Sequence, residues 1–304
     1  MVSPRNAAAV DALLEAASAG DARTLEALLT RGVVRVDDVD EGGMSALMVA
    51  AAAGQLETAR RLVKHGALVG AQRPTGTHAL FFAAQGGHEA VADYLLLSGA
   101  PVNLAGKDGS TPLFVAAQNG FTGVAQVLVQ HGVDIDKTMT DGASSLFIAS
   151  QNGHESTVKF LLKSGARLDL RRRDGASALW MASQRGWSAV VEALLAAGAT
   201  DVSEALFKAA HKGHVDVADR LLHHSRPPPT LGLLKNGESA LHAAALFGHA
   251  PMVRLLLQAG ADAHLKNSTG SEPAELALQM GYEHIASLLA DRRAFATRVP
   301  ETII

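Results

Sequence analysis

The chain has 304 residues, of which 48% are hydrophobic and 4% aromatic, and a formal net charge of −3 at pH 7. The absence of cysteine excludes disulfides, thiolate catalysis and every zinc site with a cysteine ligand. The charge gives no basic footprint for nucleic acid, and no run of about 18 apolar residues is present that could span a membrane. We expect a cytoplasmic protein, with the nucleus as an open alternative, because a fold without disulfides tolerates a reducing compartment.

The alanine-rich stretch Ala7–Ala19 suggests either a signal peptide or the first helix of the fold. Asp11 and Glu15 interrupt its apolar run, so we expect a helix. Residues 1–7 are predicted to be an N-terminal lead, and Asp11 to be the N-cap of this helix.

Glycines at a nearly constant spacing organise the rest of the chain. A period of about 33 residues is typical of a stacked solenoid, in which each repeat contacts only its neighbours. Gly54, Gly87, Gly120, Gly153 and Gly186 are 33 residues apart, Gly20 lies 34 before them, and Gly213, Gly248 and Gly281 follow at steps of 27, 35 and 33.

The segment Asp108–Asp136 shows what one period contains. It opens on Asp108-Gly109, which favours a tight turn. Thr111-Pro112 is typical of a helix start, with the hydroxyl as cap and proline in the first turn. Apolar residues at spacings of three and four then predict a short helix that ends at Gly120, and a second helix that ends at Gly132.

This pattern resembles the ankyrin repeat, whose period and Thr-Pro-Leu-His signature it shares. The resemblance covers residues 8–292. It implies an all-α, right-handed solenoid of about nine helix-turn-helix repeats with short β-hairpin fingers, the seventh repeat degenerate. It also implies a non-catalytic protein–protein interaction module, an adaptor or scaffold that binds partners on its concave face. The signature histidine occurs only as His242, and the other repeats have Met48, Phe81, Phe114, Phe147, Trp180 and Phe207 at that position.

The seventh repeat departs from the pattern. Between Gly198 and Leu206 about six residues of the finger are missing, and Asp201–Glu204 resembles a capping box that starts the helix directly. Further on, Pro227–Pro229 prevents a helix from continuing. We predict a missing finger, an irregular stretch at 199–235 that divides repeats 1–6 from 7–9, and a flexible tail at 293–304. The irregularity is either a functional device or simple decay of one repeat.

The family's concave surface implies one candidate site. In each first helix a large apolar residue precedes a glutamine by four positions, so the two share a face. A ladder of uncharged amides suits an uncharged partner or a peptide backbone. Alternatively, the aromatic residues pack between repeats and the glutamines bond along the stack. The pairs are Phe81/Gln85, Phe114/Gln118, Phe147/Gln151 and Trp180/Gln184. The helix-end candidates are Gln85, Gln118, Asn119, Gln151, Asn152, Gln184 and Arg185, and the finger candidates are Lys107, Ser110, Thr140, Arg173 and Asp174.

Two charged groups each have two interpretations. Arg171–Arg173 is either a phosphate or acidic-segment site or a solvated turn, since no aromatic or further basic cluster accompanies it. His211–His214 and His223-His224 suggest a metal site, but no carboxylate or thiol lies at ligand spacing. We therefore expect neither metal nor cofactor. In this family the position after the repeat glycine is structural, and His88, His154, His214 and His249 occupy it.

The last four residues, Glu301, Thr302, Ile303 and Ile304, resemble a C-terminal ligand of PDZ domains, or are a chance ending. No Walker loop, Gly-x-Ser-x-Gly elbow, HExxH motif or paired carboxylates occur, so we expect no enzyme. The alternatives to a scaffold are a regulatory inhibitor of one enzyme or transcription factor and a carrier of this PDZ ligand. We expect a monomer that binds proteins and no nucleic acid.

Overall fold

The computed structural model describes residues 4–224 and 231–290. The chain forms two compact units, Met1–Arg173 and Asp174–Ile304. The boundary between these units precedes the irregular stretch 199–235. The predicted division of repeats 1–6 from repeats 7–9 at that stretch stays a prediction. Pro227–Pro229 and the predicted tail at 293–304 lie outside the described residues.

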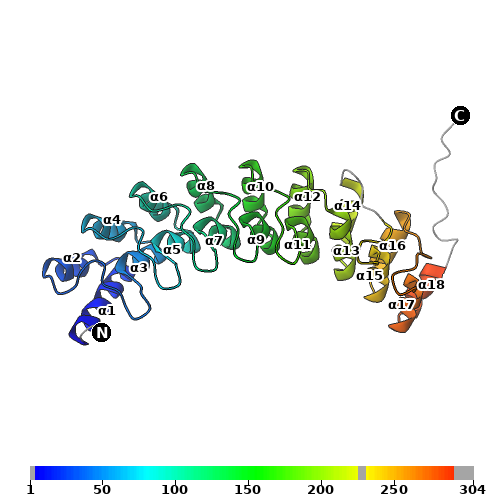
Figure 1. Cartoon of the computed structure of the whole chain (residues 1–304), viewed down its shortest axis with the longest axis horizontal. Coiled ribbons are helices and arrows are strands. Elements are labelled where there is room, and N and C mark those ends of the chain that lie inside the picture. Colours follow the sequence, from blue (N-terminus) through cyan, green and yellow to red (C-terminus); the bar gives the residue numbers. More distant parts are fainter. Residues whose placement is uncertain (1–3, 225–230, 291–304) are drawn as a thin grey trace. The chain divides into compact units, whose positions relative to one another are not determined.

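Unit 1 is a two-layered stack of short helices. Within it, Figure 1 shows the odd-numbered helices in one row, the even-numbered helices in a second row, and connecting loops that project beside the odd-numbered row. The inner row contains α1 (Pro4–Ala19), α3 (Ala46–Ala52), α5 (Ala79–Gly86), α7 (Pro112–Asn119) and α9 (Ser145–Asn152). The outer row contains α2 (Ala22–Thr30), α4 (Leu56–Lys64), α6 (Glu89–Leu97), α8 (Thr122–Gln130) and α10 (Glu155–Lys163).

Unit 2 repeats this arrangement with its own inner and outer helices. The inner helices are α11 (Ala178–Arg185), α13 (Val202–Lys212), α15 (Ala240–Leu246) and α17 (Pro273–Gln279). The outer helices are α12 (Ser188–Ala196), α14 (Val215–His224), α16 (Ala250–Gln258) and α18 (Glu283–Ala290).

The fold is an all-α repeat solenoid, as predicted. Over 4–224 and 231–290 the structure contains no β-strand. Within these residues, β-bridges occur only as the two isolated antiparallel pairs Val39–Ser45 and Gln72–His78, both in fingers. Within the same residues, no helix is both long enough and apolar enough to cross a membrane.

The inner helices begin where the sequence predicts. The hydroxyl of Thr111 accepts a hydrogen bond from the main-chain N–H of Phe114 at 3.1 Å, and Pro112 occupies the first turn, where its missing N–H costs nothing. Ala116 and Ala117 are fully buried, and their small side chains let neighbouring inner helices approach closely. The same hydroxyl cap is supplied elsewhere by Ser45, Ser144, Ser177 and Ser239.

Within each unit, the residue after a repeat glycine packs on the glycine of the preceding repeat. Gly120 ends α7 in the left-handed conformation with φ of 75°, and a Cβ there would lie 2.6 Å from His154 Nδ1. The other ring nitrogen of His154 donates to the main-chain oxygen of Gln118 at 2.9 Å. These histidines therefore tie one repeat to the next. His88, His214 and His249 are placed in the same way over Gly54, Gly186 and Gly213.

The fingers are built on the predicted Asp-Gly turns. Asp108 accepts a hydrogen bond from the main-chain N–H of Ser110 at 2.9 Å, and Gly109 between them has φ of 87°. The side chain closes the turn and the glycine supplies the backbone conformation. Asp141 and Asp174 make the same turn with Ala143 and Ala176.

The first inner helix begins earlier than predicted. Because α1 starts at Pro4, Asp11 lies in its interior, and the prediction of Asp11 as N-cap is wrong. Proline is well suited to a first helical position, and the alanines that follow favour helix, so the helix takes up part of the predicted lead at 1–7.

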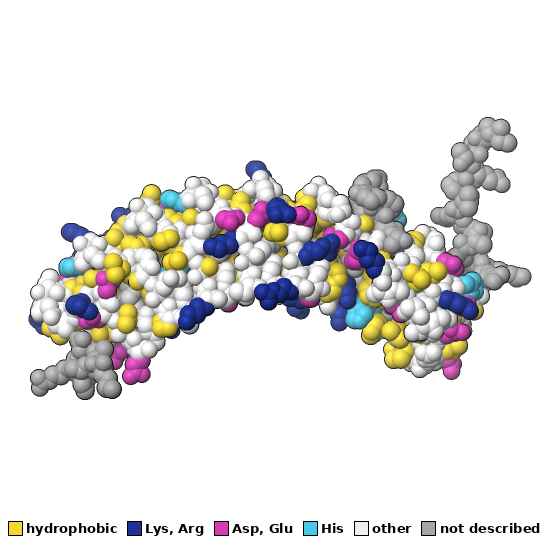
Figure 2. Space-filling view, in the orientation of Figure 1, with side chains coloured by type: hydrophobic (Ala, Val, Ile, Leu, Met, Phe, Trp, Pro, Cys, Tyr) yellow, Lys and Arg dark blue, Asp and Glu magenta, His cyan; other side chains and the backbone are white. Residues whose placement is uncertain are grey.

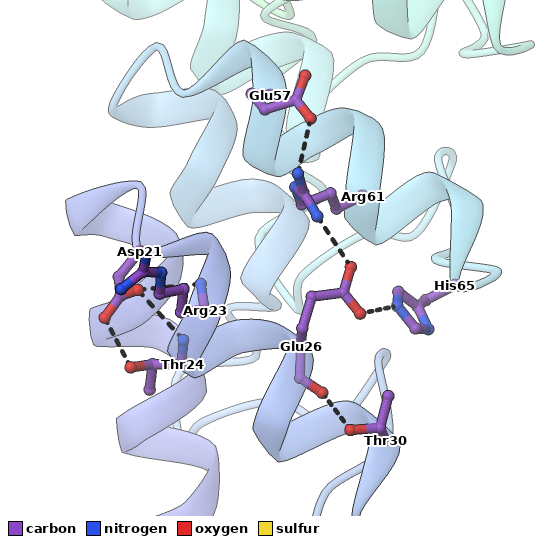
Figure 3. A network of polar contacts seen from close by, with 8 residues as sticks. All are labelled: Asp21, Arg23, Thr24, Glu26, Thr30, Glu57, Arg61 and His65. Carbon is purple, nitrogen blue, oxygen red and sulfur yellow. Dashed lines mark hydrogen bonds and ion pairs between the residues drawn. The ribbon is translucent and has the colours of Figure 1, made fainter.

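Polar contacts join α2 to the end of α4 (Figure 3). Asp21 caps α2 through its side chain. Glu26 Oε2 lies 2.8 Å from His65 Nε2, and Glu26 Oε1 lies 3.3 Å from Arg61 Nη1. The hydrogen bond with His65 is the main cause that lowers the pKa of Glu26, so this carboxylate stays charged and attaches the first helix pair to the second.

The seventh repeat lacks its finger, as predicted. Residues 197–201 alone connect α12 to α13, whereas residues 131–144 connect α8 to α9. The predicted capping box at Asp201–Glu204 is wrong, because Asp201 makes no side-chain capping bond. The hydroxyl of Ser177 donates to the Asp201 carboxylate instead.

Gly120→Ala should lower the free energy of unfolding by about 3 kcal/mol, because the new Cβ would strain a left-handed residue and overlap His154. Gly132→Ala is a matched control. Its φ is 76° and no atom lies within 4 Å of its Cβ, so we expect a loss of about 1 kcal/mol from the backbone alone. Urea unfolding followed by circular dichroism measures both changes, and equal losses would contradict a stabilising contact with His154.

His78 stands at the start of α5 where α3, α7, α9, α11 and α15 have serine or threonine. It makes no capping bond. Its ring is fully buried, Nε2 hydrogen-bonds the main-chain oxygen of Leu104 at 3.1 Å, and Nδ1 has no partner among the described residues. Burial lowers the pKa of His78, against a smaller opposing effect of the bond to Leu104.

His78→Thr should therefore reduce the acid sensitivity of the fold. Below pH of about 6.5 the unfolded chain protonates this histidine while the folded protein resists, so the free energy of unfolding falls as the pH falls. The variant removes that contribution. Unfolding curves at pH 7.5 and 5.5 should show a smaller loss of stability in the variant than in the parent, and identical losses would contradict the role of His78.

Candidate functional site

Unit 1 contains a hollow of about 410 Å³, and four of the predicted residues, Gln85, Ser110, Gln118 and Gln151, line it. The candidates Lys107, Asn119, Thr140, Asn152 and Arg173 are not among its lining residues. The inner helices and the fingers beside them both contribute. From the helices come Phe81, Gln85, Phe114, Val115, Gln118, Phe147, Ile148 and Gln151; from the fingers come Asp108, Ser110, Met139, Asp141, Ala143 and Arg172.

The aromatic residues of this hollow are mostly buried. The exposed fraction is 7% for Phe81, 5% for Phe114 and 2% for Phe147. Of the two interpretations, packing inside the stack is therefore the correct one for these three residues. Side chains held in this way give the hollow a fixed apolar base.

The glutamines lie at the open side of the helix ends. Gln85 and Gln118 are exposed, and Gln151 is half-buried against the same hollow. Within the described residues, the side-chain amides of Gln85 and Gln118 make no hydrogen bond, although their main-chain oxygens do. These two amides are available to an incoming chain.

The asparagines have a different role. Asn152 Nδ2 donates to the main-chain oxygen of Gln118 at 2.8 Å, and Asn119 Nδ2 donates to that of Val115 at 3.0 Å and that of Gln85 at 3.4 Å. They bond along the stack, as the alternative interpretation proposed for the glutamines. The sequence did not separate the two kinds of amide because their partners lie in the preceding repeat.

The fingers of unit 1 are joined through their backbones. The N–H of Lys107 donates to the main-chain oxygen of Thr75, that of Thr140 to Asp108 and that of Arg173 to Asp141, at 2.8 to 2.9 Å. Their side chains are exposed. This ladder fixes the spacing of the fingers and leaves the predicted finger side chains at the surface.

Ser110 is buried, unlike the other finger candidates, with 5% of its surface exposed. Its hydroxyl donates to Asp108, and this bond is the main cause that lowers the pKa of that carboxyl. Asp108 is therefore ionised at neutral pH and places one negative charge at the edge of the hollow.

Arg172 also lines the hollow, with Cζ 5.3 Å above the ring of Phe147. In the predicted cluster Arg171–Arg173, the middle residue thus packs on an aromatic ring, and its two exposed neighbours lie beside it. The sequence missed Asp108, Asp141 and Arg172 as lining residues, although the repeated Asp-Gly turns are a signal that could have found the two acids.

The remaining candidates belong to unit 2 or lie outside the described residues. Asp174 and Arg185 are exposed, and Gln184 is half-buried with its main-chain oxygen bonded to His214 at 3.0 Å. Glu301, Thr302, Ile303 and Ile304 lie outside the described residues. Nowhere in the described part of the chain do three or more histidine or acidic side chains come together to hold a metal ion. On the face drawn in Figure 2, basic and acidic side chains of unit 1 lie interspersed.

Comparison with known proteins gives a family. A model described as ankyrin repeats (3 copies) matches residues 13–106, 80–172, 146–231 and 206–298. The chain is similar to human ankyrin repeat domain-containing protein 29, 62% identical over 48 residues, and to its Danio rerio counterpart, 50% identical over 48 residues. Each match covers 16% of this chain and 16% of the relative. Mouse protein phosphatase 1 regulatory subunit 27 is 44% identical over 63 residues, 19% of this chain and 41% of that protein.

The bond of Asn152 predicts a purely structural effect. Asn152→Ala should lower the free energy of unfolding by about 1 kcal/mol, because it removes a hydrogen bond to the preceding repeat. Gln118→Ala removes an exposed side chain of similar polarity without such a bond and should change stability by less than about 0.5 kcal/mol. Denaturant unfolding of the two variants checks this, and equal losses would refute the assignment.

Proposed function

Because this chain belongs to the ankyrin-repeat family, whose repeats are protein–protein interaction modules, we propose that it is an adaptor or scaffold that binds partners on its inner face. The supporting observation is the hollow of about 410 Å³ between inner helices and fingers in unit 1. The family is typically non-catalytic, and we propose no enzymatic activity for this chain.

The hollow is suited to an extended peptide. The side-chain amides of Gln85 and Gln118 can each donate a hydrogen bond to a peptide backbone and accept one from it. Because these amides are uncharged, binding does not require a full charge to lose its water. Asp108, Asp141 and Arg172 at the finger side add charges of both signs. The partner segment in this proposal is uncharged along the helix side.

Rigidity supports the affinity of such a surface. The base of the hollow is formed by buried aromatic rings, and the fingers of unit 1 are joined by backbone hydrogen bonds. A surface that is already ordered loses little conformational entropy when a partner binds. The same argument applies to one partner or to several.

Two alternative roles follow from the same architecture. One relative is named as a regulatory subunit of a protein phosphatase, which supports a regulatory inhibitor of a single enzyme or transcription factor as the second candidate. The third is a carrier of the C-terminal PDZ ligand Glu301–Ile304, for which the sequence alone is the support. We further propose a monomer in the cytoplasm or nucleus.

Binding through the hollow is tested with the pair Gln85→Glu and Gln118→Glu in one variant. Both side chains are exposed, so the fold should persist. The two added charges should reduce the recovery of proteins that bind at the hollow at least fivefold. The matched control is Gln126→Glu with Gln130→Glu, which adds the same charges to exposed positions of the outer helix α8. A third bait lacks residues 301–304.

Quantitative pull-down from cell extract compares these baits with the full chain. Loss of partners only with the inner-face variant supports the proposal. Loss of partners only with the truncation supports the PDZ-ligand carrier and contradicts binding through the inner face. Equal recovery by all baits contradicts both site assignments, and loss of activity in one captured enzyme favours the inhibitor over the scaffold.

A further inference from the structure

The missing finger of the seventh repeat changes how an aromatic residue is covered. In unit 1, Arg172 of a finger lies 5.3 Å above Phe147, which is 2% exposed. In unit 2 no finger precedes α13, and Trp180 of α11 is only half-buried. Lys208 of α13 lies over the Trp180 ring instead, with Nζ 4.7 Å from the ring centre. A helix-borne lysine thus replaces a finger-borne arginine, and the indole is left partly open.

Further aromatic surface continues from α13 to α15. Lys208 Nζ also lies 5.5 Å from the ring centre of Phe207. The ring of His211 lies against that of Phe247, with 4.1 Å between their centres, and 42% of Phe247 is exposed. Figure 2 shows basic, histidine and hydrophobic side chains side by side over α13 and α15. Aromatic residues are enriched at protein-binding surfaces, and this surface offers Phe247 and the open part of Trp180.

The positive charges of this surface are not neutralised. Within the described residues, neither Lys208 nor Lys212 makes an ion pair, and exposed Glu204, one turn before Lys208 on α13, makes none either. Burial lowers the pKa of Lys208, and repulsion from Lys212 adds to it. Burial also lowers the pKa of His211, with Lys212 and Lys208 as further causes. A carboxylate placed here would relieve a repulsion that the fold itself leaves in place.

We propose that this lysine–aromatic surface, formed by Trp180, Phe207, Lys208, His211, Lys212 and Phe247, binds an acidic peptide segment that carries an aromatic or aliphatic side chain. The carboxylates pair with the two lysines, and the apolar side chain covers Phe247 and the open part of Trp180. This site lies wholly in unit 2 and does not depend on the hollow of unit 1.

Charge favours an acidic peptide at this surface over two other occupants, the chain's own segment 291–304 and single-stranded nucleic acid. The chain's own segment 291–304 has Arg292, Arg293 and Arg298 against Asp291 and Glu301, so its charge does not complement lysines. Single-stranded nucleic acid also stacks on aromatic rings, but it needs a broad positive groove along its backbone. Unit 2 instead places acidic Glu204 on the same helix as the lysines.

The partner class is tested by selecting a displayed library of random 12-residue peptides on the immobilised full chain. We expect the selected sequences to be rich in Asp and Glu and to contain Trp, Phe or Leu. Binding of a synthetic selected peptide, measured by fluorescence anisotropy, should weaken at least tenfold in the double variant Lys208→Gln with Lys212→Gln, and at least tenfold in Phe247→Ala. The control is Lys64→Gln with Lys163→Gln, two exposed lysines in the last turns of α4 and α10, and should weaken binding less than twofold.

Circular dichroism and thermal unfolding establish that each variant is folded. Selection of basic or uncharged peptides, no selection at all, or equal binding by the lysine variant would overturn the proposal. So would loss of binding in the Gln85→Glu and Gln118→Glu variant alone, which would assign the peptide to unit 1. Binding of a 20-nucleotide oligothymidine that the lysine variant loses would assign the surface to nucleic acid. Self-association abolished by the lysine variant would assign it to a second copy of the chain.

Discussion

The stack depends on one contact, made between the glycine that ends an inner helix and the side chain that follows the glycine of the next repeat. The last carbonyls of a helix lack partners within it. His154 donates to one such carbonyl, that of Gln118, and its ring lies where a Cβ on Gly120 would be. Helix termination and repeat stacking are therefore the same interaction. The contacting side chain varies while the glycine does not: Phe121 lies over Gly87, Tyr282 over Gly248 and Gln55 over Gly20.

Because this contact and the backbone ladder between fingers hold the repeats together, the surface side chains carry little of the stability. Lys107 and Thr140 hold the ladder through their N–H groups, which any residue except proline provides. Gln85 and Gln118 likewise contribute their main-chain oxygens to the stack and leave their amides outside. Partner recognition can thus change without change of fold, and the sequence alone identifies an interaction surface more readily than the molecule that binds it.

Local features were predictable from the sequence, and long-range partners were not. The helix start at Thr111, the turn at Asp108 and the glycine end at Gly120 each depend on neighbouring residues, and the structure has all three. Asn152 is a predicted partner-binding residue whose side chain also donates to the main-chain oxygen of Gln118, 34 positions earlier, and the pattern within one repeat does not predict that bond. The sequence predicts that Asp201 belongs to a capping box, but Ser177, 24 positions earlier, donates to its carboxylate. The start of α1 was not predictable for a different reason: every alanine near it favours a helix, so the composition does not mark where the helix begins.

The loss of one finger illustrates how the two kinds of contact are separable. A solenoid whose neighbours are joined at Gly186 by His214 and at Gly213 by His249 keeps its inner helices stacked whether or not a finger stands between them. The finger's other task, to cover the aromatic residue of the preceding repeat, then passes to Lys208. A lysine covers less of an indole than a finger does, and burial lowers the pKa of Lys208 because its charged ammonium is partly removed from water. Removal of a finger therefore exposes apolar and cationic surface together, at a place where the stack itself needs neither.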